Sequence, residues 1–450
     1  MRHFILFFAI LYIQPRFTNG QHNQLQEYIT LGIKNNTTIN EATLQFEASV
    51  ENLNQTRGQL LPTVDFGTRY TRAFGGRAVE FPLGDLMNPV YSTLNGLTGE
   101  DQFPQIENQS FNFNRTTDIE TKLSLSQPVL DRRLSFQKKI AEEQAKMSNV
   151  DISIAKRSLV AQIKSAYFNY LKTEKLLDVF QISRDLVEEN LRVSERLYEN
   201  DKVTVDAVLR ARTELSNIEL QIAEAEKLVN NSRAYFNFLL NRPLETEIIA
   251  EEMIQLPTPS TTMSDDLLKR EEFTKLKLGM AANKHEHKLY ASNNLPNIYA
   301  VADYGFQGTE YVFNNESDYA LASLVLSWNL FSGFQNKSMK QKVRIQRKIL
   351  ESQQQSLSNN IALESTQALY DMKEKLQKYN ATQNMEQEAK TSFELVQKKY
   401  KEGMATQVEL LDARTNYTNA SLQNIISKYD IWISHAELER VTASYPIDNI

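Results

Sequence analysis

The chain has 450 residues and a formal net charge of −6, and its lysines and arginines form no dense block, so nucleic-acid binding has little support. It contains no cysteine, which excludes disulfides, thiolate metal sites and a cysteine nucleophile. Only 14 glycines and 11 prolines occur, a composition that favours long uninterrupted helices.

The first residues have the pattern of an export signal. Arg2 and His3 precede an apolar run over residues 4–13, and small residues follow up to Gly20. This pattern predicts a secretory signal peptide over residues 1–20. The apolar run is too short for a spanning helix, and no later run reaches the roughly 18 residues that such a helix needs.

The next part of the chain alternates between helix and strand patterns. Apolar residues recur every three or four positions over residues 21–58, which predicts a helix with a possible interruption at 35–38. Alternating apolar and polar residues predict strands at 63–71 and 118–126, the second ended by Pro128. The segment between these strands is rich in glycine, proline and asparagine and is interpreted as a long loop over residues 73–117.

The alternating pattern of a predicted strand is compatible with two different environments. The apolar face of the strand at 118–126 would be core in a soluble sandwich, whereas in a membrane barrel it would face lipid. In the barrel, the charged and hydroxylic face would line a wet lumen. One strand alone does not decide between these two environments.

A long helical hairpin follows. Residues 132–199 contain no proline or glycine and keep a helical spacing, which gives a rod of about 100 Å at 1.5 Å per residue. A break at 200–203 precedes a second helix, which Asn241 and Pro243 stop. Its apolar positions follow a three-four alternation that includes several small residues, which is typical of a coiled-coil seam.

The second half of the chain repeats this plan. We predict a first structural repeat at 21–241, a connector at 242–264 and a second repeat at 265–450. The elements expected in the second repeat are a helix at 265–294, strands at 297–306 and 319–330, and helices at 337–401 and 408–442.

The break between the two long helices is itself duplicated. Tyr198 and Tyr400 begin the two copies, and 400 minus 198 gives an offset of 202. Leucine, alanine, arginine and two threonines recur at the same offset. The chain is therefore predicted to contain two helical hairpins, each with this break at its tip.

Four strands per chain constrain the assembly. Strands of about ten residues are long enough to cross a bilayer when tilted, but four of them do not close a barrel and an open edge does not face lipid. The strands must therefore come from several chains, with the helices continuing as a tube. Such a tube favours transport over catalysis. A non-channel coiled-coil structural protein of the periplasm is the alternative, although it would not need alternating strands.

The order of these features resembles the TolC family of outer-membrane efflux proteins. The resemblance rests on the duplicated tips, on the strand-to-helix segments SQPVLD and SWNLFSG, and on FLLNRP at the end of a long helix. It implies a mainly α protein with a small β part, assembled as a homotrimer with a twelve-stranded β-barrel in the outer membrane and an α-helical barrel in the periplasm.

The resemblance also implies partners and a function. The trimer would be a passive exit duct that docks to a periplasmic adaptor and an inner-membrane transporter, with no enzymatic activity, cofactor or metal. Type I protein secretion is the alternative to small-molecule efflux. Specificity for cargo would reside mostly in the partner pump.

The second tip carries two acidic residues that match the family's periplasmic constriction. Glu409 and Asp412 are three residues apart and share a helix face, so a threefold ring would place six carboxylates around the pore. Alternatively, both are ordinary solvated acids, which are favoured near a helix N-terminus. The first copy differs, because Ala207 stands at the position of Glu409.

Both tips match the surface where the family meets its adaptor. Gly403 is expected to take a positive φ, and Asp201 replaces it in the first copy. The arginine that the family carries after this glycine is absent, since Ala405 stands there, so the closure network must differ. The residues assigned to the tip and adaptor docking are Tyr198, Asp201, Thr204, Tyr400, Gly403 and Thr406.

Overall fold

A computed structural model describes residues 24–251, 255–258 and 269–447. The predicted signal peptide at 1–20 lies outside these residues, as does part of the predicted connector at 242–264. The chain forms two compact units. Each unit draws segments from both predicted repeats, so the repeat boundaries stay a prediction. The first unit comprises Met1–Glu47, Lys146–Leu278 and Leu350–Ile450, and the second comprises Ala48–Ala145 and Gly279–Ile349.

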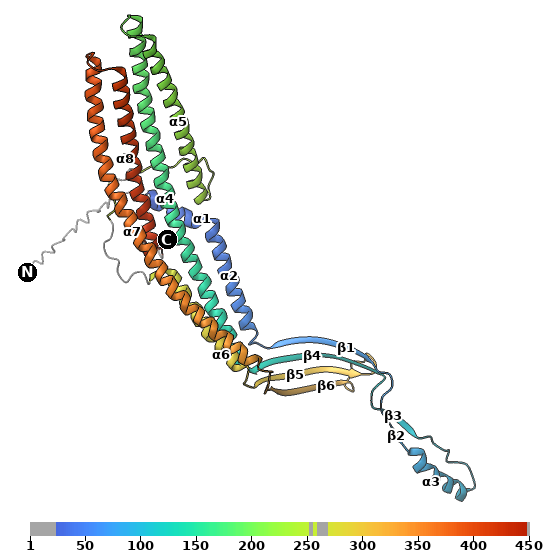
Figure 1. Ribbon diagram of the computed structural model, residues 1–450. Coiled ribbons are helices and arrows are strands. Elements are labelled where there is room, and N and C mark those ends of the chain that lie inside the picture. Colours follow the sequence, from blue (N-terminus) through green and yellow to red (C-terminus); the bar gives the residue numbers. More distant parts are fainter. Residues whose placement is uncertain (1–23, 252–254, 259–268, 448–450) are drawn as a thin grey trace, which may run out of the picture. The chain divides into compact units, whose positions relative to one another are not determined.

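Long helices dominate the first unit (Figure 1). The helices α4 (Arg132–Glu199) and α5 (Val205–Leu239) form one hairpin, and α7 (Gln335–Lys401) and α8 (Gln407–Thr442) form the other. The predicted helix at 132–199 is confirmed at both ends, and those at 337–401 and 408–442 are confirmed to within about two residues. Helices of this length form because neither proline nor glycine interrupts them.

The predicted coiled-coil seam of α5 is confirmed. Its buried side chains follow the three-four alternation, and they include Val208, Ala211, Ile218, Ala225, Val229, Ser232, Phe236 and Leu239. Within each hairpin a buried hydroxyl pair crosses the seam, Thr173 with Ser232 at 2.8 Å and Thr382 with Ser427 at 2.6 Å. The two hairpins therefore use the same type of polar contact at a seam position.

The main core of the first unit lies at the base of the hairpins, remote from their tips. Here α1 (Gln24–Asn35) packs against α4 and the end of α5, and Tyr28, Tyr167 and Phe236 bring their rings within about 6 Å of one another. The interruption predicted near residue 36 is confirmed. Asn36 accepts a hydrogen bond from the backbone N–H of Thr38 at the start of α2 (Thr37–Gly58).

The two hairpins meet along α4 and α8, which run antiparallel. Residues with higher numbers on α4 contact residues with lower numbers on α8. The contacts run in this order from the base of the hairpins to their tips. Polar pairs along this α4–α8 seam include Lys164–Glu439 at 2.6 Å, Lys172–Asp430 at 3.2 Å, Ser183–Thr418 at 3.4 Å and Ser194–Gln407 at 3.1 Å.

The second unit contains a four-stranded antiparallel sheet in the order β1-β4-β5-β6. Its strands are β1 (Thr63–Arg72), β4 (Thr117–Leu130), β5 (Asn297–Gly308) and β6 (Asp318–Ser327), as Figure 1 shows. The helix α6 (Glu271–Ser292) precedes β5. Strand β5 pairs with β4 over eleven residues, which joins the strands of the two predicted repeats into one sheet.

The two faces of the sheet differ in polarity. The register places Phe66 opposite Leu123, and Leu123 opposite Tyr304, so these side chains share an apolar and exposed face. On the other face, Lys122 lies between Glu120 at 3.7 Å and Asp303 at 3.2 Å. In the described part of the chain, the outer edges of β1 and β6 pair with no other strand.

The prediction of a loop over residues 73–117 is wrong. This segment contains β2 (Ala78–Phe81) and β3 (Gln109–Asn112), which pair with each other, and the helix α3 (Leu83–Thr98). Pro89 lies inside α3, and glycine and asparagine interrupt its pattern, so the composition suggested a loop. The helical period survives in Leu83, Val90 and Leu97.

Two strand ends also differ from prediction. Strand β4 continues past Pro128 to Leu130, with an irregular register between these residues, because a proline without an N–H is accommodated at such a bulge. Strand β6 ends at Ser327, three residues before the predicted end at 330. In the next residue, Trp328, the indole N–H donates to the backbone carbonyl of Asn294 at 3.0 Å. No helix among the described residues is both long and apolar enough to cross a membrane.

Candidate functional site at the hairpin tips

The two tips have the same backbone. Asp201 and Gly403 take positive φ values of 54° and 73°, as predicted for both. In the first tip the N–H of Asp201 donates to the carbonyl of Tyr198 at 3.0 Å, and in the second tip the N–H of Gly403 donates to that of Tyr400 at 3.0 Å. A second bond, from the following residue to the helix, completes a Schellman motif in each copy. The sequence repeat is therefore also a conformational repeat.

The helices that leave the tips begin differently. Thr406 and Thr204 have nearly identical backbone angles, but only Thr406 forms a capping box. The carboxylate of Glu409 accepts a hydrogen bond from the backbone N–H of Thr406 at 2.7 Å, and the N–H of Glu409 donates to the hydroxyl of Thr406 at 3.3 Å. Ala207 offers no carboxylate at the equivalent place in the first tip.

The capping box favours the charged form of Glu409. Hydrogen bonds from the backbone and the hydroxyl of Thr406 lower the pKa of this exposed carboxyl below its ordinary value. Asp412 is also exposed, one turn further along α8, and accepts a long hydrogen bond from Asn416 at 3.3 Å. Glu409 therefore has the role of a helix-start acid, and its exposure also leaves it available to a pore.

A polar contact joins the two tips. The amide of Gln407 donates to the hydroxyl of Ser194 and to the backbone carbonyl of Ala207, both at 3.1 Å. Tyr400 also forms a hydrogen bond with Ser194. Burial raises the pKa of the Tyr400 phenol, and this hydrogen bond opposes the rise only in part. Sequence reasoning left this network unassigned. Glutamine and serine at helix positions carry no distinctive pattern, so no signal pointed to them.

The matched arginines of the two tips have different surroundings. Arg212 is exposed and pairs with Glu195 of α4 within its own hairpin, at 2.9 Å. Arg414, its equivalent, is buried and pairs with Glu214 of the other hairpin. The tyrosines differ in the same way, because Tyr198 is 47% exposed whereas Tyr400 packs against the tip cluster of Phe393, Leu410 and Ala413.

A cavity of about 680 Å³ lies between the tips. It brings together Tyr400, Gly403 and Thr406 of the predicted tip residues. Tyr198, Asp201 and Thr204 do not line it, nor do Glu409 and Asp412. The second tip thus faces the first hairpin through this cavity.

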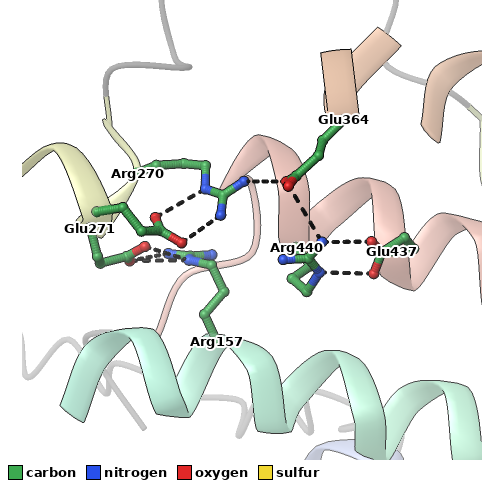
Figure 2. A network of polar contacts seen from close by, with 7 residues as sticks. Arg157, Arg270, Glu271, Glu364, Glu437 and Arg440 are labelled. Atoms are coloured by element: carbon green, nitrogen blue, oxygen red, sulfur yellow. Dashed lines mark hydrogen bonds and ion pairs between the residues drawn. The ribbon is translucent and has the colours of Figure 1, made fainter. Parts of the chain in front are cut away.

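The base of the hairpins is held by a network of ion pairs (Figure 2). Arg157 of α4 forms a two-pronged pair with Glu271 at the start of α6, with a shortest distance of 2.6 Å. Arg270, whose side chain is 6% exposed, contacts Glu272 at 2.5 Å and Glu364 of α7 at 2.9 Å. Burial alone would raise the pKa of Glu272, but its bonds from Arg270 outweigh burial and lower that pKa.

The chemistry of the described residues does not assemble a metal centre. In residues 24–251, 255–258 and 269–447, no three histidine, aspartate or glutamate side chains lie close enough together to hold an ion. The polar groups at the tips are instead arranged as helix caps and as contacts between the hairpins.

Comparison with known proteins identifies the family. The family model described as outer membrane efflux protein matches residues 29–242 and 263–444. The chain belongs to this outer membrane efflux protein family. It is accordingly an outer-membrane protein that extends into the periplasm, and it serves as an exit duct and not as an enzyme. Channels of this family generally form trimers and work with adaptor proteins and inner-membrane transporters.

Solved structures show the same fold at low sequence identity. The CmeC outer membrane channel of Campylobacter jejuni has a TM-score of 0.75 at 17% identity, with 93% of this chain and 85% of that chain covered. The open-state MtrE channel of Neisseria gonorrhoeae has a TM-score of 0.74 at 18% identity, with 93% and 88% covered. VceC of Vibrio cholerae has a TM-score of 0.72 at 12% identity, with 93% and 96% covered. A search of curated protein sequences finds no match.

Proposed function

We propose that three copies of this chain form a passive efflux duct whose entrance is gated at the six hairpin tips. The observation that carries the proposal is the sheet, which has one apolar exposed face, one polar face and two open edges. An open edge is not stable in lipid, so the sheet needs neighbouring copies. Three sheets of four strands give a closed barrel of twelve.

The two faces of the sheet fit the two surfaces of such a barrel. The exposed face that carries Phe66, Leu123 and Tyr304 would contact outer-membrane lipids. The opposite face pairs Arg69 with Glu120 at 2.9 Å and Lys122 with Asp303 at 3.2 Å. Charged pairs in this position suit a water-filled lumen.

The tips support a gated entrance. Glu409 and Asp412 are exposed on successive turns of α8, so three copies would contribute six carboxylates to a constriction. The capping box holds Glu409 in one orientation and favours its charged form. Opening would separate the second hairpin from the first and break the contacts of Gln407.

The tips are also the proposed docking surface for the periplasmic adaptor, which would link the duct to an inner-membrane transporter. The residues proposed to contribute are Tyr198, Asp201, Thr204, Tyr400, Gly403 and Thr406. The Schellman motifs present the two tips in the same conformation, so one type of partner contact could be repeated six times around a trimer. The signal peptide predicted at residues 1–20 would direct the chain out of the cytoplasm and then be removed.

The mass of the detergent-solubilised protein and its conductance in planar lipid bilayers test the proposal. A trimeric mass together with discrete cation-conducting channels is expected. A monomeric mass in mild detergent, or a trimer that never conducts, would contradict it.

A further inference from the structure

We propose that the cavity between the hairpin tips is a binding site for a small organic anion with an apolar body. Its volume of about 680 Å³ lies in the range of roughly 300–1,000 Å³ that drug-sized ligands occupy. The inference rests on the fold of one protomer, and it adds a ligand to the entrance of the proposed duct. It does not depend on which adaptor or cargo the duct serves.

Apolar side chains form the walls of the cavity. Leu186, Val193 and Leu197 come from α4 of the first hairpin, and Phe393 and Leu410 come from the second. Walls of this kind favour a flat or branched hydrocarbon body, since burying apolar surface contributes about 25 cal/mol per Å². A ligand in this position would touch both hairpins at once.

Arg414 provides the strongest polar feature of the cavity. This side chain is only 5% exposed, and one of its nitrogens, Nη2, pairs with Glu214. Its Nε and Nη1 atoms have no hydrogen-bond partner among residues 24–251, 255–258 and 269–447. A buried donor without an acceptor is costly, so these atoms would gain from a ligand oxygen.

The charges around the cavity favour an anion. Lys202 and Lys401 line it together with Arg414, whereas Glu189 is its one acidic lining residue. Glu189 is already paired with Arg192 at 2.5 Å. The amide of Asn190, which also lines the cavity, has no partner in the described chain and could bind a second oxygen. A carboxylate on an apolar body matches this combination of walls and donors.

Binding would act on the gate. Because the walls come from both hairpins, an occupant that fits the present arrangement favours the state in which the tips stay together. A bound anion would therefore lower the fraction of time that the entrance is open. The site would respond to organic anions in the periplasm without requiring their transport.

Titration calorimetry on the full-length channel in lipid nanodiscs tests the site, with empty nanodiscs subtracted. The probe is 2-naphthoate, and 2-naphthamide is its neutral counterpart of the same shape. We expect 2-naphthoate to bind about tenfold more tightly than the amide, because charge-assisted bonds to arginine are stronger. Arg414→Gln should lower the naphthoate affinity about tenfold and leave the amide affinity nearly unchanged.

Two further variants separate the site from the fold. Val193→Trp fills the cavity and should abolish binding of both probes, while Arg210→Gln removes an exposed tip arginine outside the cavity and should change neither. If Arg414→Gln fails to assemble, the probe pair and Val193→Trp carry the test. Equal naphthoate affinity in wild type and Val193→Trp, or absence of binding to an intact trimer, would overturn the site. Conductance measured without probe tests the duct separately.

Discussion

The base and the tip of the α4–α8 seam are built from different interactions. At the base, Lys164 and Glu439 form an ion pair at 2.6 Å, and the large core of α1, α4 and α5 lies beside it. At the tip, Ser194 and Gln407 share a neutral hydrogen bond at 3.1 Å beside a small cluster and a cavity. The same two helices are therefore fixed at one end and weakly held at the other.

This difference indicates where the molecule can move. Local opening has the lowest free energy where apolar burial is small and hydrogen bonds are exposed. Separation of the tips breaks the neutral contacts of Gln407 and the ion pair between Arg414 and Glu214, whereas separation at the base would expose the larger core and several buried ion pairs. This gradient supports the proposed gate at the tips, with a hinge toward the base, and the predictions below test its two ends.

The largest effect is expected at the base. Arg270→Ala removes a buried guanidinium that pairs with Glu272 and Glu364, and it should destabilise the protein by about 3 kcal/mol, because Glu272 loses this partner and Glu364 keeps only the longer contact with Arg440 at 3.8 Å. Thermal unfolding in detergent measures the change. Lys175→Ala, which breaks an exposed pair with Asp178, is the matched control and should cost no more than about 0.5 kcal/mol. Equal destabilisation by the two variants would contradict the proposal that buried ion pairs hold the base together.

The opposite pattern is expected at the tip. Gln407→Ala removes the contacts with Ser194 and Ala207, and should cost only about 1 kcal/mol while raising single-channel conductance. Planar-bilayer recordings and thermal unfolding on one preparation measure both effects. Gln423→Ala, at an exposed glutamine of the same helix, is the control and should leave conductance unchanged. A conductance equal to wild type would show that this contact does not restrain the gate.

Charge at the constriction has a smaller effect than the contact between hairpins. Glu409→Gln combined with Asp412→Asn removes six charges from a trimer, and glutamine can preserve the capping box. We expect weaker block by multivalent cations, by about tenfold, with little change in stability. Asp206→Asn, which breaks an exposed pair at the first tip, is the control. Unchanged block in the double variant would place the two acids outside the pore and leave Glu409 only its capping role.

Acid should weaken the block by multivalent cations only at a pH below the ordinary pKa of a glutamate. Because hydrogen bonds from Thr406 lower the pKa of Glu409, it stays ionised at pH values where an ordinary glutamate, of pKa 4.5, is half protonated. The capping contribution is present above 4.5 and is lost as the pH falls through the lowered pKa. Cation block recorded from pH 6 downward should therefore persist below 4.5. Thr406→Val removes one of the hydrogen bonds and should shift this loss to higher pH, whereas a midpoint that does not move would contradict the assignment.

The elements that repeat were predictable from the sequence, and the contacts between them were not. Long stretches without glycine or proline determine α4 and α7, and a residue that tolerates positive φ marks each tip at Asp201 and Gly403. The helix α3 was missed because Pro89 and its glycines conceal a helical period. The tip contact of Gln407 and the burial of Arg414 depend on how two distant hairpins pack, which local patterns do not encode.

The most direct test of a moving tip on a fixed base is a cross-link across the seam. The chain has no cysteine, so a Ser194→Cys, Gln407→Cys pair can be bridged with a short thiol-reactive cross-linker. A Thr382→Cys, Ser427→Cys pair, bridged in the same way, links helices within one hairpin and is the control. The account predicts that the tip bridge abolishes channel opening in bilayers and that the control bridge does not. Tip-bridged channels that open as often as unbridged ones would contradict it.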